Sequence, residues 1–220
     1  EFVYLDITHK DPKEVMSHFP NIYKKCLSIG IDLTKDMIPV VPAAHYCCGG
    51  IKVNLNGESS IRRLYALGEA SSTGLHGGNR LASNSMMEAA VYADAAARHA
   101  ISVIDSIELQ RDIPAWDYEG TAVPEEMALI TQDYKEMQQI MTNYVGIVRS
   151  DVRLERAKRR LEIIFKETEE LYLKSTLSQH LCELRNMIAV GYLIIKQAEA
   201  RHESVGLHYS IDYPAKPVEI

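Results

Sequence analysis

Two side chains in the first half of the chain could hold a ligand that carries carboxylates. Arg80 lies in a glycine-rich loop, where the backbone can approach a ligand closely. The guanidinium of an arginine binds a carboxylate through two parallel hydrogen bonds. His45 lies between a proline and a double glycine, so we expect it on an irregular segment where it could donate to a second carboxylate. A surface salt bridge for Arg80 and a satisfied core histidine at position 45 remain open alternatives.

Three further residues could contact a polar or anionic ligand. Glu69 follows a short apolar run, and ligands of open α/β sheets lie beyond the carboxyl ends of the strands. Its carboxylate could accept hydrogen bonds from sugar hydroxyls. Ser85 and Met86 stand at the expected start of a helix, where free backbone N–H groups and the helix dipole favour an anion. A solvated loop residue and an ordinary capped helix are the alternatives that remain open.

The spacing of the metal-ligating residue types does not predict a metal site. His45, Cys47 and Cys48 match no usual zinc pattern, and no fourth ligand follows nearby. Nothing positions a base for a nucleophilic cysteine. The chain also lacks a G-x-S-x-G motif, a phosphate loop and a G-x-G-x-x-G motif. The 4 cysteines show no spacing typical of a secreted scaffold, which favours the reducing cytoplasm.

The elements before the glycine-rich loop mix helix and strand. Asp11 and Pro12 predict a helix start, and a second short helix should end at Gly30. Residues 38–44 should be extended around two prolines. Leu64–Leu67 is a short apolar run that ends at a glycine, which indicates a buried parallel strand.

A long alanine-rich helix should follow the glycine-rich loop. We expect it to begin between Ser83 and Ser85 and to run to about Ala100. Ser85 and Glu88 have the spacing of a capping box, in which each side chain bonds a backbone N–H of the first turn.

The second half of the chain has a purely helical period. Residues 106–124 contain two prolines and a glycine and are interpreted as a linker. Three apolar stripes with steps of three and four follow, and the short joins near Ser150 and Ser175 favour an antiparallel bundle over a coiled-coil interaction module. The stripe residues are Met127, Ile130, Tyr134, Met137, Met141 and Tyr144, then Leu154, Ala157, Leu161, Ile164, Thr168 and Leu171, then Leu177, Leu181, Leu184, Ile188, Tyr192 and Ile195.

The composition is that of a globular protein, with 46% hydrophobic and 25% charged residues in a chain of 220. A net charge of −6 argues against a nucleic-acid surface. No apolar run reaches the roughly 20 residues that a membrane-spanning helix needs. Glu1 is not an initiator methionine, and Phe2–Leu5 read as a strand already under way, so we expect a piece of a longer protein.

Three consecutive motifs, together, resemble the succinate dehydrogenase/fumarate reductase flavoprotein family. They are Pro42–Gly50 (PAAHYCCGG), Leu64–Ala70 (LYALGEA) and Gly74–Ser85 (GLHGGNRLASNS). The resemblance implies an α+β fragment with three parts. These are the end of a substrate-capping domain (1–45), the C-terminal part of an α/β FAD-binding domain (46–115) and a C-terminal antiparallel three-helix bundle (116–220).

The resemblance also implies roles for the residues that match the motifs. Glu69 would bind ribityl or ribose hydroxyls of FAD, and Ser85 and Met86 would present the helix start to the isoalloxazine, whose reduced form is anionic. His45 and Arg80 would hold the two carboxylates of a C4 dicarboxylate. The G-x-G-x-x-G half and the catalytic arginine of the family would lie upstream of Glu1, so we expect no catalytic residue in this chain and no FAD on the isolated fragment.

Within the family, the motif spelling and the C-terminal Glu203–Tyr213 segment favour oxidation of L-aspartate to iminoaspartate. The acceptor would be oxygen, with H2O2 formed, or fumarate, and the product would feed quinolinate and NAD synthesis, with quinolinate synthase as a partner. Gly78 stands where the family commonly has alanine, and Val205 where it usually has arginine. The alternatives are a fumarate reductase or succinate dehydrogenase flavoprotein and a non-catalytic helical interaction module.

Overall fold

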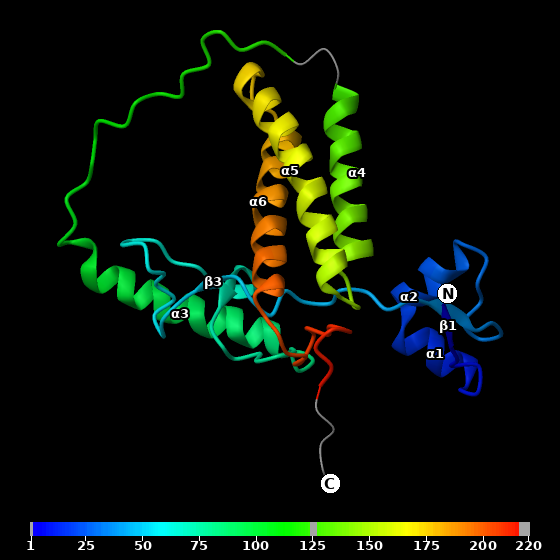
Figure 1. Ribbon diagram of the computed structural model, residues 1–220. Helices are drawn as coiled ribbons and strands as arrows, with labels where there is room; N and C mark the ends of the chain where they lie inside the picture. Colours follow the sequence, from blue (N-terminus) through cyan, green and yellow to red (C-terminus); the bar gives the residue numbers. More distant parts are fainter. Residues whose placement is uncertain (1, 124–126, 216–220) are drawn as a thin grey trace. The chain divides into compact units, whose positions relative to one another are not determined.

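The structure is a computed structural model that describes residues 2–123 and 127–215 (Figure 1). Three sequence-based predictions therefore fall partly outside the described residues: the linker end at 124, the side chain at 127 and the tail to residue 220. The chain divides into two compact units, Glu1–Ala43 and Ala44–Ile220, and each is described by itself.

The first unit is a small α and β assembly. β1 (Val3–Leu5) pairs antiparallel with β2 (Ile38–Val40). α1 (Pro12–His18) and α2 (Pro20–Leu27) lie between them in the chain. A cluster of Val15, Cys26 and Leu33 forms the core of the unit.

The start of α1 and the end of α2 follow from local interactions. Asp11 caps α1, because its carboxylate accepts the N–H groups of Lys13 and Glu14 at 2.9 and 3.2 Å. The predicted start of α1 is confirmed. α2 ends at Leu27, and Gly30, with a φ of 84°, lies in the turn that follows.

The strands of the second unit are short. β3 (Ile51–Lys52) pairs parallel with β4 (Ser71–Ser72). β4 directly follows a 3-10 turn, η1 (Gly68–Ala70). The predicted buried parallel strand at 64–67 is wrong. Tyr65 instead makes an isolated antiparallel bridge to Glu58.

A tight turn explains this difference. Leu64 N–H donates to the carbonyl of Ile61 over 3.1 Å, and Arg63 between them has a positive φ of 70°. The apolar run therefore folds back on the residues just before it, and Leu64 stays 41% exposed. An apolar run is typical of a buried strand, but its composition does not specify a partner.

α3 (Asn84–Ile104) begins where the sequence predicts and continues four residues beyond Ala100. The predicted capping box is wrong. Ser83 is the N-cap residue, it has a left-handed φ of 68°, and no side chain caps the first turn. Glu88 is only 3% exposed and bonds side chains of the glycine-rich loop instead of the helix start.

The three predicted apolar stripes fall on three helices, except that Leu177 lies before the third helix. The helices are α4 (Met127–Tyr144), α5 (Asp151–Lys174) and α6 (Gln179–Glu199). Ser150 and Ser178 cap α5 and α6 with their hydroxyls. Residues 107–121 and 123 of the linker lie outside helices and strands.

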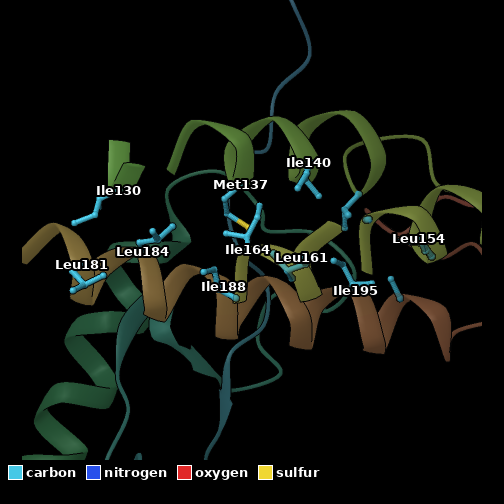
Figure 2. Close-up of a cluster of buried hydrophobic side chains, with 13 residues drawn as sticks. Ile130, Met137, Ile140, Leu154, Leu161, Ile164, Leu181, Leu184, Ile188 and Ile195 are labelled. Atoms are coloured by element: carbon cyan, nitrogen blue, oxygen red, sulfur yellow. The ribbon is translucent and has the colours of Figure 1, made fainter. Parts of the chain in front are cut away.

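The three helices share one hydrophobic core. Figure 2 shows side chains of α4 (Ile130, Met137), α5 (Leu161, Ile164) and α6 (Leu181, Leu184, Ile188) directed toward one another. In α6, Gly191 is buried rather than the predicted Tyr192. A Cβ on Gly191 would overlap the side chain of Met137. Among the described residues, no helix is both long and apolar enough to cross a membrane.

Candidate functional site

The structure brings Arg80, His45 and Ser85 together from three separate segments. Arg80 Nη2 donates to His45 Nε2, and Arg80 Nη1 donates to the hydroxyl of Ser85 over 3.3 Å. The guanidinium carbon lies 5.0 Å from the centre of the Tyr46 ring, in cation–π contact. The two residues that the sequence suggests for carboxylate binding are therefore neighbours, although 35 positions separate them.

The guanidinium of Arg80 presents a buried donor to a ligand. Its Nε–H is buried and has no hydrogen-bond partner among the residues that the structure describes. A buried N–H without an acceptor is costly, and a bound anion would remove that cost. A planar carboxylate suits this donor, because Nε and one Nη of arginine bind two oxygens in parallel.

The residues suggested for a nucleotide cofactor lie on η1 and on the first turn of α3. Glu69 is exposed, and its Oε1 accepts the N–H of Cys47 over 3.0 Å. Met86 is 77% exposed on the first turn of α3. Because no side chain caps this turn, the N–H groups of Ser85 and Met86 are available to an anion, whereas that of Asn84 donates to the carbonyl of Leu81 over 3.3 Å.

A buried polar cluster around Glu88 was not found by sequence reasoning. Glu88 Oε1 accepts the hydroxyl of Thr73 at 2.5 Å, and Oε2 lies 2.7 Å from His76 Nε2. Tyr46 donates its hydroxyl to Oε2 over 3.3 Å. Burial raises the pKa of Glu88, but the hydrogen bonds from Thr73, His76 and Tyr46 outweigh it and lower the pKa below its ordinary value.

One signal in the sequence could have indicated this cluster. Glu88 stands among apolar and alanine residues on a helix, where a lone carboxylate is either exposed or paired. The spacing of Glu88 to Ser85 also fits a capping box, and that local interpretation was chosen instead of a pairing with distant side chains.

The loop that carries Arg80 also contacts the C-terminal segment. Leu207 N–H donates to the carbonyl of Gly78 over 2.9 Å. A Cβ on Gly78 would lie 3.0 Å from Gly206 Cα, so even alanine requires a small displacement here. The side chain of Val205 would lie 3.8 Å from the same Cβ. The two departures from the family pattern, Gly78 and Val205, are therefore neighbours.

The cysteines form no disulfide in the part of the chain that the structure describes. Cys47 and Cys48 carry free thiols, as do Cys26 and Cys182. Within residues 2–123 and 127–215, no group of three or more His, Cys, Asp or Glu side chains could hold a metal ion.

Two protein families match separate parts of the chain. Residues 1–86 match the FAD binding domain family, and residues 134–217 match the family described as fumarate reductase flavoprotein C-term. The first match contains the loop with His45 and Arg80, and the second contains α5 and α6. Both parts of the chain are therefore similar to flavoproteins of the succinate dehydrogenase/fumarate reductase family.

Curated members of this family align over nearly the whole chain. An L-aspartate oxidase of Vibrio cholerae is 44% identical over 99% of the chain. An L-aspartate oxidase of Yersinia pestis is 48% identical over 96% of it, and a chloroplastic L-aspartate oxidase of Nicotiana tabacum is 41% identical over 97%. The chain spans 41%, 40% and 35% of the lengths of these relatives, respectively.

Solved structures of the family have the same fold. A quinol fumarate reductase of E. coli aligns with a TM-score of 0.81 at 26% identity, over 99% of this chain and 40% of that one. Sdh1 of Mycobacterium smegmatis aligns with a TM-score of 0.72 at 28% identity, over 97% of this chain and 38% of that one.

Proposed function

We propose that this chain is the C-terminal part of an FAD-dependent L-aspartate oxidase. The complete enzyme would oxidise L-aspartate to iminoaspartate and reduce oxygen to H2O2 or fumarate to succinate. The observation that carries the proposal is the pairing of Arg80 with His45, in a chain 41–48% identical to L-aspartate oxidases across its length. Iminoaspartate would enter de novo NAD biosynthesis.

In this proposal Arg80 and His45 each bind one carboxylate of aspartate. The Nε–H of Arg80, which has no partner in the described part of the chain, supports this role because it can form one of the two parallel bonds to a carboxylate. A ligand between the two residues would replace the direct contact of Arg80 Nη2 with His45 Nε2. The chain thus binds and orients the substrate, and the residue that transfers the proton would lie in the part of the enzyme before Glu1.

The residues of η1 and α3 fit an FAD cofactor. Bound FAD would supply the hydride acceptor of the reaction. The exposed carboxylate of Glu69 can accept hydrogen bonds from ribityl or ribose hydroxyls. The uncapped first turn of α3, at Ser85 and Met86, can stabilise negative charge on the ring through its N–H groups.

We further propose a division into three parts. Residues 1–45 would end a substrate-capping domain, 46–115 would complete the FAD-binding domain, and 116–220 would form an antiparallel three-helix bundle. The shared core of α4, α5 and α6 supports the last part. Quinolinate synthase is a proposed partner because it would consume the product, and the free cysteines favour a cytoplasmic location.

An aspartate-dependent peroxide assay on the full-length protein tests the proposed function. Purified holoenzyme should release H2O2 with L-aspartate and not with L-asparagine, which has a single carboxylate. Equal turnover of the two amino acids, or none with aspartate under oxygen or fumarate, would reject the function.

One observation favours a second candidate within the same family. The fumarate reductase of E. coli shares the fold over 99% of the chain. The same purified protein decides between the two, since a succinate dehydrogenase or fumarate reductase flavoprotein would transfer electrons from succinate to an artificial acceptor. A protein that binds no flavin at all would instead support a non-catalytic helical module.

A further inference from the structure

Glu88 is a buried carboxylate with no role in the proposed chemistry. Its side chain is 1% exposed, and it takes hydrogen bonds from three side chains that come from two separate segments. Thr73 and His76 belong to the glycine-rich loop, and Tyr46 belongs to the segment of His45. A carboxylate removed from water is stable only when such partners satisfy it.

We propose that Glu88 is a positioning residue that sets the orientation of the Arg80 guanidinium for the substrate carboxylate. The inference rests on the proposed function, because it assigns the dicarboxylate as the ligand of Arg80. Glu88 acts at a distance from the substrate, through Tyr46 on one side and through the loop of Thr73 and His76 on the other.

The first connection passes through the ring of Tyr46. Its hydroxyl donates to Glu88 over 3.3 Å, and Arg80 lies over its face at 5.0 Å from the ring centre. The ring of His76 meets the same ring edge-on at 5.1 Å. The bond to Glu88 therefore fixes the plane on which the guanidinium lies.

The second connection passes along the loop. Thr73 stands near the beginning of the loop and Arg80 at its end, with His76 between them. Glu88 binds the first two through side-chain hydrogen bonds of 2.5 and 2.7 Å, and Thr73 also accepts the N–H of Leu75 over 3.1 Å. Because Ser85, one turn before Glu88 on α3, accepts a hydrogen bond from Arg80, the loop is attached to the same helix at both ends.

An ionised carboxylate can accept every hydrogen bond of this arrangement. Thr73 Oγ and Tyr46 Oη both donate, and the His76 nitrogen bonds the same oxygen as Tyr46. A glutamine has one oxygen and one NH2 group. Its NH2 group would therefore face Thr73 Oγ or Tyr46 Oη, which both donate to the carboxylate. The lowered pKa of Glu88 agrees with an ionised group at neutral pH.

A double-mutant cycle on the FAD-loaded full-length protein tests the inference. Glu88→Gln, Arg80→Lys and the double variant are titrated with succinate, a C4 dicarboxylate, and followed by the change in flavin absorbance. Glu88→Gln should weaken succinate binding by about tenfold to a hundredfold, the range for a hydrogen bond to a charged group. In the Arg80→Lys background the same change should have almost no further effect, because Glu88 acts through Arg80.

Two further variants make the result decisive. Asp94→Asn removes an exposed carboxylate from the same helix and should leave succinate binding unchanged. If Glu88→Gln does not fold, Tyr46→Phe removes the hydroxyl while keeping the ring beneath Arg80, and it should weaken binding in the unmodified background alone.

Additive effects of Glu88→Gln and Arg80→Lys would overturn the inference, as would unchanged binding in Glu88→Gln and Tyr46→Phe. A different result would reject the proposed function alone: the unmodified holoenzyme would bind succinate but would not oxidise aspartate. An unmodified holoenzyme that binds no succinate would overturn both.

Discussion

The helical core and the glycine-rich loop are ordered by opposite means. α4, α5 and α6 bury aliphatic side chains such as Leu181, Leu184 and Ile195, which are all fully buried. Residues 44–83 bury few apolar side chains, and a polar cluster around Glu88 connects them to α3. Apolar packing tolerates changes of detail, whereas a buried carboxylate requires each of its donors.

This difference indicates how the two regions serve an enzyme. An apolar core is non-directional, so it supplies stability without fixing a single atom to a fraction of an ångström. Hydrogen bonds to a buried charge are directional, so they can hold a guanidinium in one orientation. We therefore expect changes in the loop to alter ligand binding and changes in the core to alter the free energy of unfolding.

The largest effect is expected from the absence of the dinucleotide-binding half that the proposed enzyme would have. The isolated 220-residue chain should hold no FAD, because the phosphate contacts of a dinucleotide come mainly from the G-x-G-x-x-G half, which this sequence lacks. Gel filtration with added FAD and an absorbance spectrum of the protein peak provides the measurement. Flavin bands of stoichiometric intensity in that peak would show that η1 and α3 are sufficient to bind FAD.

Arg80→Lys in the full-length enzyme tests the loop directly. A lysine ammonium cannot reproduce the bidentate geometry of a guanidinium. We expect kcat/KM for aspartate to fall while FAD stays bound. The loss of transition-state stabilisation should be about 2–5 kcal/mol. Arg98→Lys, at an exposed ion pair on α3, is the matched control and should retain turnover. Near-normal turnover per bound flavin in Arg80→Lys would contradict the assignment.

Leu184→Ala tests the core. We expect residues 116–220 expressed alone to be helical and to melt cooperatively, because the three apolar stripes can pack on one another. Within this segment Leu184→Ala should lower the free energy of unfolding by about 2–5 kcal/mol. Leu173→Ala, at a position 74% exposed, should change it by less than about 0.5 kcal/mol. Circular dichroism during urea titration measures both, and an aggregated or non-cooperative segment would show dependence on the rest of the chain.

The smallest effect concerns a buried histidine in the C-terminal segment. His208 accepts from Arg149 over 2.8 Å, and its other ring nitrogen lies 3.2 Å from the carbonyl of Arg201. Burial lowers the pKa of His208 below its ordinary 6.5, and the positive charge of Arg149 lowers it further, against the smaller opposing effect of the hydrogen bond to the Arg201 carbonyl.

The sign of the resulting pH dependence follows from linkage. The unfolded chain binds a proton more readily than the folded one between the lowered pKa and about 6.5, so stability is complete above about pH 6.5 and declines as the pH falls below it. His208→Gln should remove this dependence, whereas His180→Gln, at an exposed position, should retain it. Urea titrations of residues 116–220 at about pH 7.5 and pH 5.5 give the measurement. The prediction would be contradicted if the free energy of unfolding changed equally with pH in the unmodified segment and in His208→Gln.

Prediction from the sequence succeeded where the cause of a structure is local. Asp11 and Pro12 predict the start of α1, and the steps of three and four predict α4, α5 and α6. Caps and apolar periods act within one or two turns, so the residues that determine them are adjacent in the sequence.

Prediction failed where the type and spacing of the residues did not specify their partner. Leu64–Leu67 reads as a buried strand, but the turn at Arg63 pairs it with its own neighbour. Glu88 reads as a capping residue, but its partners Tyr46, Thr73 and His76 lie 42, 15 and 12 positions away.

The sequence by itself determined the helices, the order of the three motifs and the family that they indicate. The tertiary structure alone decided that Arg80 meets His45, that Tyr46 lies beneath Arg80 and that Glu88 is buried against the loop. The physical reason is that helix periods and caps depend on neighbouring residues, whereas a buried ionised group is stable only where the whole fold assembles its donors around it.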